Sequence, residues 1–254
     1  MRRGFTMYVD SHSTLWPEGT EFAQRVLTRI PEASGARLLL RCWKENVIAM
    51  AEAAGIKKAV TWVMGGADTE LCRLGNEWLA RTLRELPGRF LPMAVVNPHE
   101  RDSALAELDR RLENDDFVGL KLHPIVQGIA LDHPNVKSLI RRAAEYEIPV
   151  VMHIDPAVLE GDEPFTDVSY SPYCRPELVR DLVDIYDSPR LICAHGGGLL
   201  DAELPTSRVS FQTTGISTRL IEHACRTVGA GRILFGSDFP FYEIAGEVEK
   251  VRAA

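Results

Sequence analysis

The chain has 254 residues, of which 45% are hydrophobic and 26% are charged, and its formal net charge is −7. This length fits one large α/β domain, and the composition is that of an ordinary globular protein. The acidic balance argues against a general nucleic-acid-binding surface and against an anionic membrane as partner.

The cysteines and the N-terminus bear on the cellular setting. Five cysteines occur without a C-x-x-C pair, and an odd count argues against a disulfide framework. Arg2 and Arg3 are not followed by the apolar region of a signal peptide. No apolar run approaches the ~20 residues of a membrane helix. We therefore expect a cytoplasmic protein that acts on a small molecule.

Apolar runs of strand length alternate along the chain with segments of helical spacing. We expect strands at Thr6–Val9, Ala59–Val63, Phe90–Val96, Phe117–Leu122, Ile148–Met152, Leu191–Ala194, Val209–Gln212 and Ile233–Phe235. Helices are expected at 43–54, 69–86, 104–113, 136–146, 176–185, 218–228 and 243–251, with Asp68 or Thr69 capping the second and Asn135 the fourth. Eight repeats favour a single-domain (β/α)₈ TIM-like barrel over residues 1–254 rather than an open doubly wound sheet.

Chemically active side chains follow five of these strands. They are Asp10 and His12, Lys121 and His123, His153 and Asp155, His195, and Asp238. Because parallel barrels keep their chemistry at the carboxyl ends of the strands, we expect these groups to meet at one mouth.

Two loops are expected beside that mouth. Gly196–Gly198 let the backbone turn sharply after His195 and leave space beside its imidazole. The segment 155–174 is long and rich in Pro, Gly, Asp and Ser, which is typical of a loop that covers a substrate. Trp16, after the first strand, is expected to form an aromatic wall.

Histidine and carboxylate side chains that converge in this way are typical of a divalent metal site. Zinc takes imidazole nitrogen and carboxylate oxygen and keeps a position open for water. The candidates are His12, His153, His195 and Asp238. A bound ion would make hydroxide available near neutral pH, and Asp238 could take the proton as general base.

Five motifs resemble the amidohydrolase superfamily, in the branch that includes aminocarboxymuconate-semialdehyde and resorcylate decarboxylases. They are Val9–His12, Lys121–Pro124, Val151–His153, Ala194–Gly198 and Phe235–Pro240. The resemblance implies a metal-assisted hydrolase or a nonoxidative decarboxylase, and a homodimer. It implies His12, His153 and Asp238 as ligands of zinc or manganese, with His195 either binding the metal or polarising the substrate.

The chain departs from the family pattern at two places. The family's first strand ends in Asp-x-His-x-His, and here Thr14 stands at the second histidine. A hydroxyl is a poor ligand for such a metal, so the site is expected to bind metal weakly, to use His195 instead, or to work without metal. Family members also continue with a further C-terminal helix, which we expect to be absent from residues 1–254.

Lys121 has three interpretations. It binds a substrate carboxylate as a point charge, it is a carbamylated metal ligand, or it pairs with a neighbouring carboxylate. We expect the substrate to be bound by Lys121 together with His123, Trp16 and Thr14.

Three functions follow from these residues. The leading hypothesis is hydrolysis of an amide, lactone or ester by water held at His12, His153 and Asp238, with His195 polarising the carbonyl. The alternative is nonoxidative decarboxylation of an unsaturated or aromatic acid, with Asp238 managing the proton. The third is a metal-independent enzyme or a ligand-binding relative, which the presence of Thr14 suggests.

Overall fold

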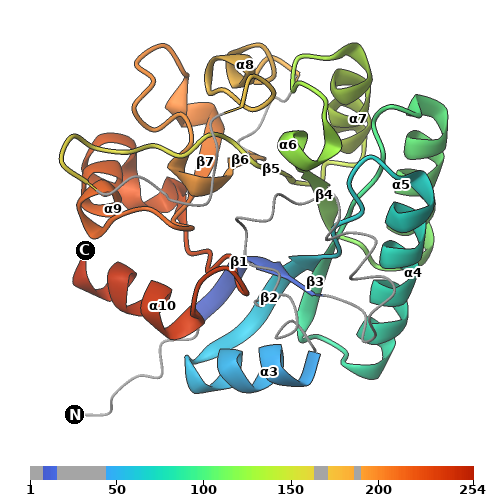
Figure 1. The fold of residues 1–254 in the computed structure, drawn as a ribbon, viewed down its shortest axis with the longest axis horizontal. Helices are drawn as coiled ribbons and strands as arrows, with labels where there is room; N and C mark the ends of the chain where they lie inside the picture. The colour runs from blue at the N-terminus through green and yellow to red at the C-terminus, as the bar shows by residue number, and fades with distance from the viewer. Residues whose placement is uncertain (1–7, 16–43, 163–170, 186–189) are drawn as a thin grey trace.

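Eight parallel strands form the centre of the fold (Figure 1). The computed structural model describes residues 8–15, 44–162, 171–185 and 190–254. Each strand pairs with the next one in chain order. The strands are β1 (Tyr8–Thr14), β2 (Ile56–Trp62), β3 (Phe90–Ala94), β4 (Gly119–Leu122), β5 (Val150–Met152), β6 (Leu191–Cys193), β7 (Val209–Gln212) and β8 (Ile233–Leu234).

The residues directly after β8 close the barrel against β1. The backbone N–H of Ser11 donates to the Phe235 carbonyl at 2.8 Å, and that of Asp238 donates to the His12 carbonyl at 2.8 Å. Ser13 and Phe239 form a parallel bridge further along. The predicted single-domain (β/α)₈ barrel is thus confirmed, nearly closed and with β8 only two residues long.

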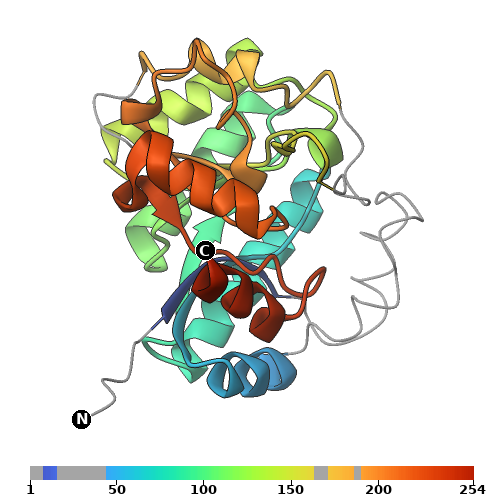
Figure 2. The same cartoon turned by 90° about the vertical axis from the view of Figure 1, so that its left-hand side faces the viewer.

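Helices alternate with the strands and cover the barrel. They are α3 (Lys44–Ala53), α4 (Thr69–Glu85), α5 (Arg101–Asn114), α6 (Pro124–Gln127), α7 (Pro134–Glu145), α8 (Glu177–Arg180), α9 (Thr218–Ala224) and α10 (Ile244–Ala253). The last helix, α10, lies beside α9 and α3 near the chain's C-terminus (Figure 2). Asp68 caps α4 as predicted, accepting from the Leu71 N–H at 3.0 Å.

Several predicted boundaries differ from the structure; the helix expected at 104–113, for example, begins at Arg101. The first strand runs to Thr14 instead of ending at Val9, because its later residues pair with β2 on one side and with the segment after β8 on the other. The helix expected at 176–185 is limited to α8, and residues 181–185 form turns. The helix expected at 218–228 does span that range, but only Thr218–Ala224 is α-helical and Cys225–Gly229 form a π-helix.

One predicted cap is also wrong. Asn135 does not cap α7, because that helix already begins at Pro134. The side chain of His133 takes this role, its Nδ1 accepting from the Asn135 N–H at 3.1 Å. A proline at the first helical position has no N–H to satisfy, so α7 can begin at Pro134 rather than at the expected residue 136.

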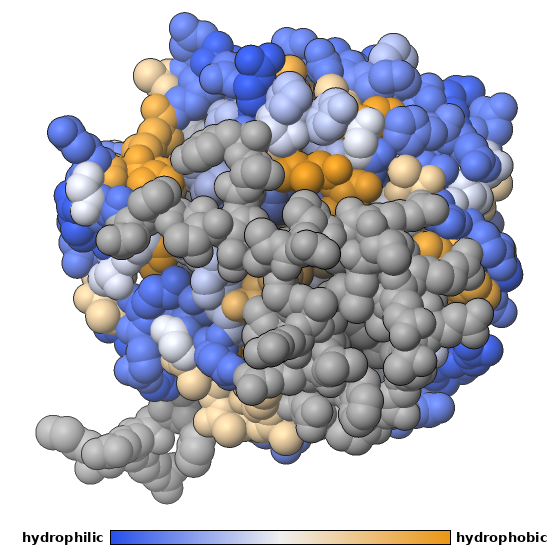
Figure 3. All heavy atoms as spheres, viewed as in Figure 1, coloured by the Kyte–Doolittle hydropathy of each residue, from blue (hydrophilic) through white to orange (hydrophobic). Residues whose placement is uncertain are grey.

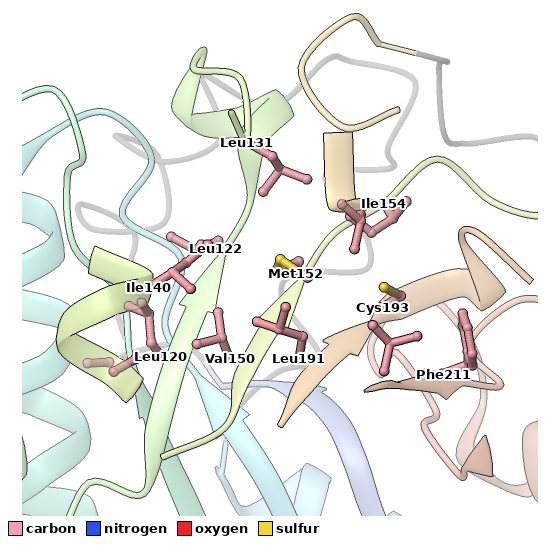
Figure 4. Packing of buried hydrophobic residues seen from close by; sticks show 14 of the residues in the cluster. Leu120, Leu122, Leu131, Ile140, Val150, Met152, Ile154, Leu191, Cys193 and Phe211 are labelled. Atoms are coloured by element: carbon pink, nitrogen blue, oxygen red, sulfur yellow. The ribbon is translucent and has the colours of Figure 1, made fainter. Parts of the chain in front are cut away.

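Successive side chains of a strand point to opposite faces of the sheet, and this decides which of them enter the barrel. Pairs such as Leu120 and Leu122 on β4 and Val150 and Met152 on β5 point into the apolar layer between sheet and helices (Figure 4). The residues between them face the opposite way. For β5 the intervening residue is Val151, which packs in a second cluster around Trp62. For β4 it is Lys121, which therefore places a cation inside the barrel.

On the face shown in Figure 3, hydrophilic residues predominate among the described residues, and hydrophobic residues form small separate patches between them. Among the described residues, no helix is long and apolar enough to span a membrane.

Candidate active site

Three strand ends bring His12, His195 and Asp238 together. Each offers one ligand atom, and these atoms all lie within 4.8 Å of one another. All three residues are buried, so their polar atoms are removed from bulk water. His12 comes from β1, His195 follows β6 and Asp238 follows β8.

Gln212, the last residue of β7, fixes the proton on the His12 ring. Its Nε2 donates to the backbone carbonyl of Ser11 at 2.7 Å and to the Ser11 Oγ at 2.9 Å. Its Oε1 therefore faces His12 Nδ1, at 2.7 Å. Since an amide oxygen only accepts, Nδ1 carries the hydrogen and Nε2 carries a lone pair.

That lone pair faces Asp238. His12 Nε2 lies 3.1 Å from Asp238 Oδ1. A neutral imidazole nitrogen and an ionised carboxylate oxygen both accept, so this contact calls for a shared proton or a cation between them. Imidazole nitrogen and carboxylate oxygen are ligands of zinc and of related divalent ions. The donor set therefore fits such an ion.

His153 joins this group through His195. His195 Nδ1 lies 3.2 Å from the Thr214 carbonyl oxygen and 3.1 Å from the Thr214 hydroxyl, and its Nε2 lies 3.0 Å from His153 Nδ1. His153 Nε2 has no partner among the described residues. The ring of His123 stacks on His153 with centroids 4.3 Å apart. The imidazoles of His12, His123, His153 and His195 thus form one connected cluster.

Burial keeps these imidazoles neutral. It lowers the pKa of His195 to about 3 and holds the pKa of His12, His123 and His153 well below the usual value. Burial also raises the pKa of Asp238 to about 6, although the neighbouring His195 and Lys121 oppose this rise. The site therefore offers uncharged nitrogen ligands beside a carboxyl group that can hold a proton.

The backbone is constrained where these groups leave their strands. His195 and Asp238 adopt φ values of 57° and 56°, a region that residues other than glycine rarely occupy. Such conformations cluster at functional sites because the surrounding structure has to enforce them. Gly197 permits a close approach beside His195, since a Cβ there would lie 2.4 Å from the Ile154 side chain. The space expected from the glycine run is used by the backbone after β5.

Lys121 is buried, and none of the described residues forms an ion pair with it. Its side chain is 1% exposed, and its Nζ makes no hydrogen bond within the described residues. The ammonium lies 4.5 Å from the centroid of the Trp62 ring, which is a cation–π contact. Burial lowers the pKa of Lys121 to about 7, against the opposing attraction of Asp238. Among the described residues no carboxylate is in ion-pair contact with Lys121, so within them its pairing with a neighbouring carboxylate is not observed.

Asp10 links β1 to the segment after β8, which carry the candidate metal ligands His12 and Asp238. Its carboxylate accepts from the N–H of His12 at 3.0 Å and from the N–H and hydroxyl of Ser237 at 2.9 and 2.5 Å. Burial raises the pKa of Asp10 to about 7. Because His12 and Asp238 adjoin these contacts, Asp10 sets their relative position.

A family model described as amidohydrolase matches residues 9–250 of the chain. The chain belongs to the amidohydrolase family. The resemblance inferred from the five motifs is thereby confirmed, and the protein is an enzyme of this superfamily.

Relatives of this amidohydrolase-family chain carry decarboxylase names. Decarboxylase orsB of Emericella nidulans is 32% identical over 91 residues, which are 35% of this chain and 28% of that protein. The match thus spans less than a third of its length. A 2,6-dihydroxybenzoate decarboxylase from Rhizobium has a TM-score of 0.69 and 18% identity, over 96% of this chain and 90% of that one.

A 5-carboxyvanillate decarboxylase from Novosphingobium aromaticivorans, complexed with manganese, has a TM-score of 0.72 and 18% identity over 96% of this chain and 88% of that one. At these identities the two structures establish only a shared fold.

The amidohydrolase-family barrel brings most of the predicted site residues to one mouth. Thr14 is buried two residues beyond His12, and its Oγ1 has no partner among the described residues. Trp16 lies outside the described residues, as does part of the predicted covering loop. The metal group that the geometry assembles contains His195, whereas the set expected from sequence contained His153.

Sequence reasoning missed two residues of this site. Gln212 was recognised only as the end of a strand, although a polar residue at that position is the signal that identified His195 and Asp238. Trp62 lies within the strand expected at Ala59–Val63, without a predicted role in the site. It is buried there, and its ring also contacts His12 at 4.6 Å between centroids.

Proposed function

We propose that this amidohydrolase-family barrel is a nonoxidative decarboxylase of a small aromatic or unsaturated carboxylic acid. The observation that carries the proposal is the buried ammonium of Lys121, which has no hydrogen-bond partner among the described residues. A buried cation is costly unless an opposite charge meets it, and a substrate carboxylate would supply that charge. Neutral amides, lactones and esters would not.

The named relatives support the same choice. Decarboxylase orsB and the dihydroxybenzoate and carboxyvanillate decarboxylases favour decarboxylation, the alternative in the sequence analysis, over the hydrolysis that was its leading hypothesis. These names describe those proteins, and they enter here as support for a substrate class. Flat acids also suit a site walled by Trp62 and stacked imidazoles.

His12, His195 and Asp238 would hold a divalent metal in this enzyme, with His153 as the further candidate from sequence. Manganese accompanies three of the similar structures, and zinc suits the same ligands. When bound, such an ion supplies a Lewis acid that polarises substrate oxygen atoms. Thr14 contributes a hydroxyl in place of an imidazole, which makes His195 the natural replacement ligand.

Decarboxylation replaces a carboxylate by a proton at one carbon atom. In the proposal Lys121 holds the substrate anion, and protonated Asp238 donates its proton to the carbon that carries the carboxylate. The bond to the carboxylate then breaks, its electron pair restores the π system, and carbon dioxide leaves. Asp238 regains a proton from solvent before the next turnover.

Other side chains in the mouth would orient the substrate. His123 Nδ1, His153 Nε2 and Thr14 Oγ1 are buried polar atoms without partners among the described residues. Buried polar atoms normally have a hydrogen-bond partner, so these atoms are suited to bind hydroxyl groups of a substrate. We include His123 and Thr14 in the substrate-binding set on this basis.

A substrate panel tests the proposal. Protein loaded with manganese or zinc would be incubated with hydroxybenzoic and unsaturated acids, and in parallel with amides, lactones and esters. We expect carbon dioxide in the headspace from at least one acid, and a loss of at least about 100-fold in Asp238→Asn. Hydrolysis products without carbon dioxide would overturn the proposal.

A further inference from the structure

Gln212 occupies an unusual place in the barrel. It ends β7, yet its side chain reaches β1, although β8 lies between these strands in the sheet order. β8 is only two residues long. Gly236, shortly after it, packs closely between its neighbours, since a Cβ there would lie 2.9 Å from the His12 Cβ and 2.7 Å from the Thr214 Cγ2.

The contacts of Gln212 leave it one orientation. The carbonyl of Ser11 can only accept, so the amide nitrogen of Gln212 has to face it, at 2.7 Å. Ser11 Oγ reinforces this choice, since its own hydrogen is donated to the Phe235 carbonyl at 2.6 Å. The Ser11 carbonyl orients the Gln212 amide directly, and the Phe235 carbonyl does so through Ser11 Oγ. The acceptor Oε1 of Gln212 therefore faces His12 Nδ1.

Asp238 is a second possible acceptor for the proton of the His12 ring. Asp238 Oδ1, 3.1 Å from Nε2, would accept a hydrogen from that nitrogen if the ring adopted the other tautomer. Nε2 would then have no lone pair, and His12 could not act as a ligand through it. The amide of Gln212 and the carboxylate of Asp238 therefore compete for one proton from opposite sides of the ring.

We infer that Gln212 is a positioning residue that holds the proton of His12 on Nδ1, against Asp238, and so keeps Nε2 open as a metal ligand. Groups that bind the outer nitrogen of a ligand histidine fix its tautomer and orientation, and their loss typically lowers metal affinity by about 10- to 100-fold. The metal part of this inference rests on the proposed function. The tautomer part does not.

Two variants of Gln212 test whether it sets the tautomer of His12. Gln212→Met removes the acceptor at similar length, and the proton is then expected to move to Nε2 and hydrogen-bond to Asp238. Gln212→Glu provides a rescue, because a neutral carboxyl can donate to the Ser11 carbonyl and accept from His12 Nδ1.

The chain also offers a matched control. Gln127 is likewise buried, accepts from the His123 N–H at 2.7 Å and donates to the Val96 carbonyl at 2.8 Å. Gln127→Met removes two comparable bonds without contacting the His12 ring.

Nitrogen NMR on histidine-labelled, metal-free protein reads the tautomer directly. We expect a protonated Nδ1 on His12 in the wild type, in Gln212→Glu and in Gln127→Met, and a protonated Nε2 in Gln212→Met. A His12 tautomer unchanged in Gln212→Met would overturn the inference.

Manganese and zinc titrations then test the consequence for the metal. Dissociation constants are expected to rise about 10- to 100-fold in Gln212→Met alone. Equal weakening in Gln127→Met would contradict a specific positioning role. If the wild type shows the expected tautomer but binds neither ion, the metal part of the proposed function fails while the role of Gln212 in setting the tautomer stands.

Discussion

Replacing Lys121 by methionine is expected to stabilise the protein while impairing its function. The ammonium is buried against Trp62 with no hydrogen bond among the described residues, and burial lowers its pKa from 10.5 to about 7. One pKa unit corresponds to about 1.4 kcal/mol, so keeping this charge in the folded protein costs a few kcal/mol, on the order of 3 to 5. Methionine has a similar length and carries no charge to desolvate.

The free energy of unfolding that Lys121→Met gains over the wild type should depend on pH. Below pH 7 Lys121 is protonated in both the folded and the unfolded states, so the full cost is present. Between pH 7 and 10.5 the unfolded chain binds the proton more tightly than the folded protein does, and the cost declines as pH rises. The advantage of Lys121→Met is therefore largest near pH 6 and approaches zero near pH 10.5.

Urea denaturation of the metal-free protein at pH 6 and pH 9.5 measures this difference. Arg111→Met is the matched control, because Arg111 is equally buried but is paired with Glu107 and Asp115 at 2.7 Å each. Removing that cation should destabilise the protein by about 3 to 5 kcal/mol. A Lys121→Met protein that is less stable than wild type at pH 6, or whose gain does not change with pH, would refute the reasoning.

Three further predictions concern Asp10, Gly197 and the proposed metal. Asp10→Ala leaves the buried N–H groups of His12 and Ser237 without their acceptor and should lower the free energy of unfolding by about 3 kcal/mol in denaturant titrations; Asp10→Asn, which keeps an acceptor, should lose much less. Gly197→Ala forces a Cβ to 2.8 Å from the Asp155 carbonyl oxygen and should lower thermal stability, by about 3 kcal/mol. Gly231→Ala, in open space, should melt like wild type. Chelation should abolish carbon dioxide release and manganese should restore it, so activity that persists in demonstrably metal-free protein would contradict a metal-assisted reaction.

The barrel could be predicted because its signals are local. Each buried strand is a short apolar run that ends in a polar residue, and such runs are recognisable without knowing their partners. His195 and Asp238 were identified in this way. The left-handed backbone of both residues was not, because it depends on the surrounding structure that holds them.

Long-range contacts account for the rest. β1 was expected to stop at Val9, since nothing in its own sequence shows that residues 235–239 would pair with it. Gln212 acquires its role only when the folded barrel brings its side chain to His12, 200 residues away in the sequence. The difference between His153 and His195 as members of the metal group likewise depends on distances that spacing along the chain does not contain.

The most direct test of decarboxylation at this site is the mass of the product formed in deuterium oxide. With an acid that the substrate panel identifies, the proposal predicts a product shortened by one carboxyl group and carrying one deuterium on the carbon that bore it. Asp238→Asn should form this product far more slowly. A product that gains solvent oxygen and no carbon-bound deuterium would identify hydrolysis and contradict the proposed role of Lys121 and Asp238.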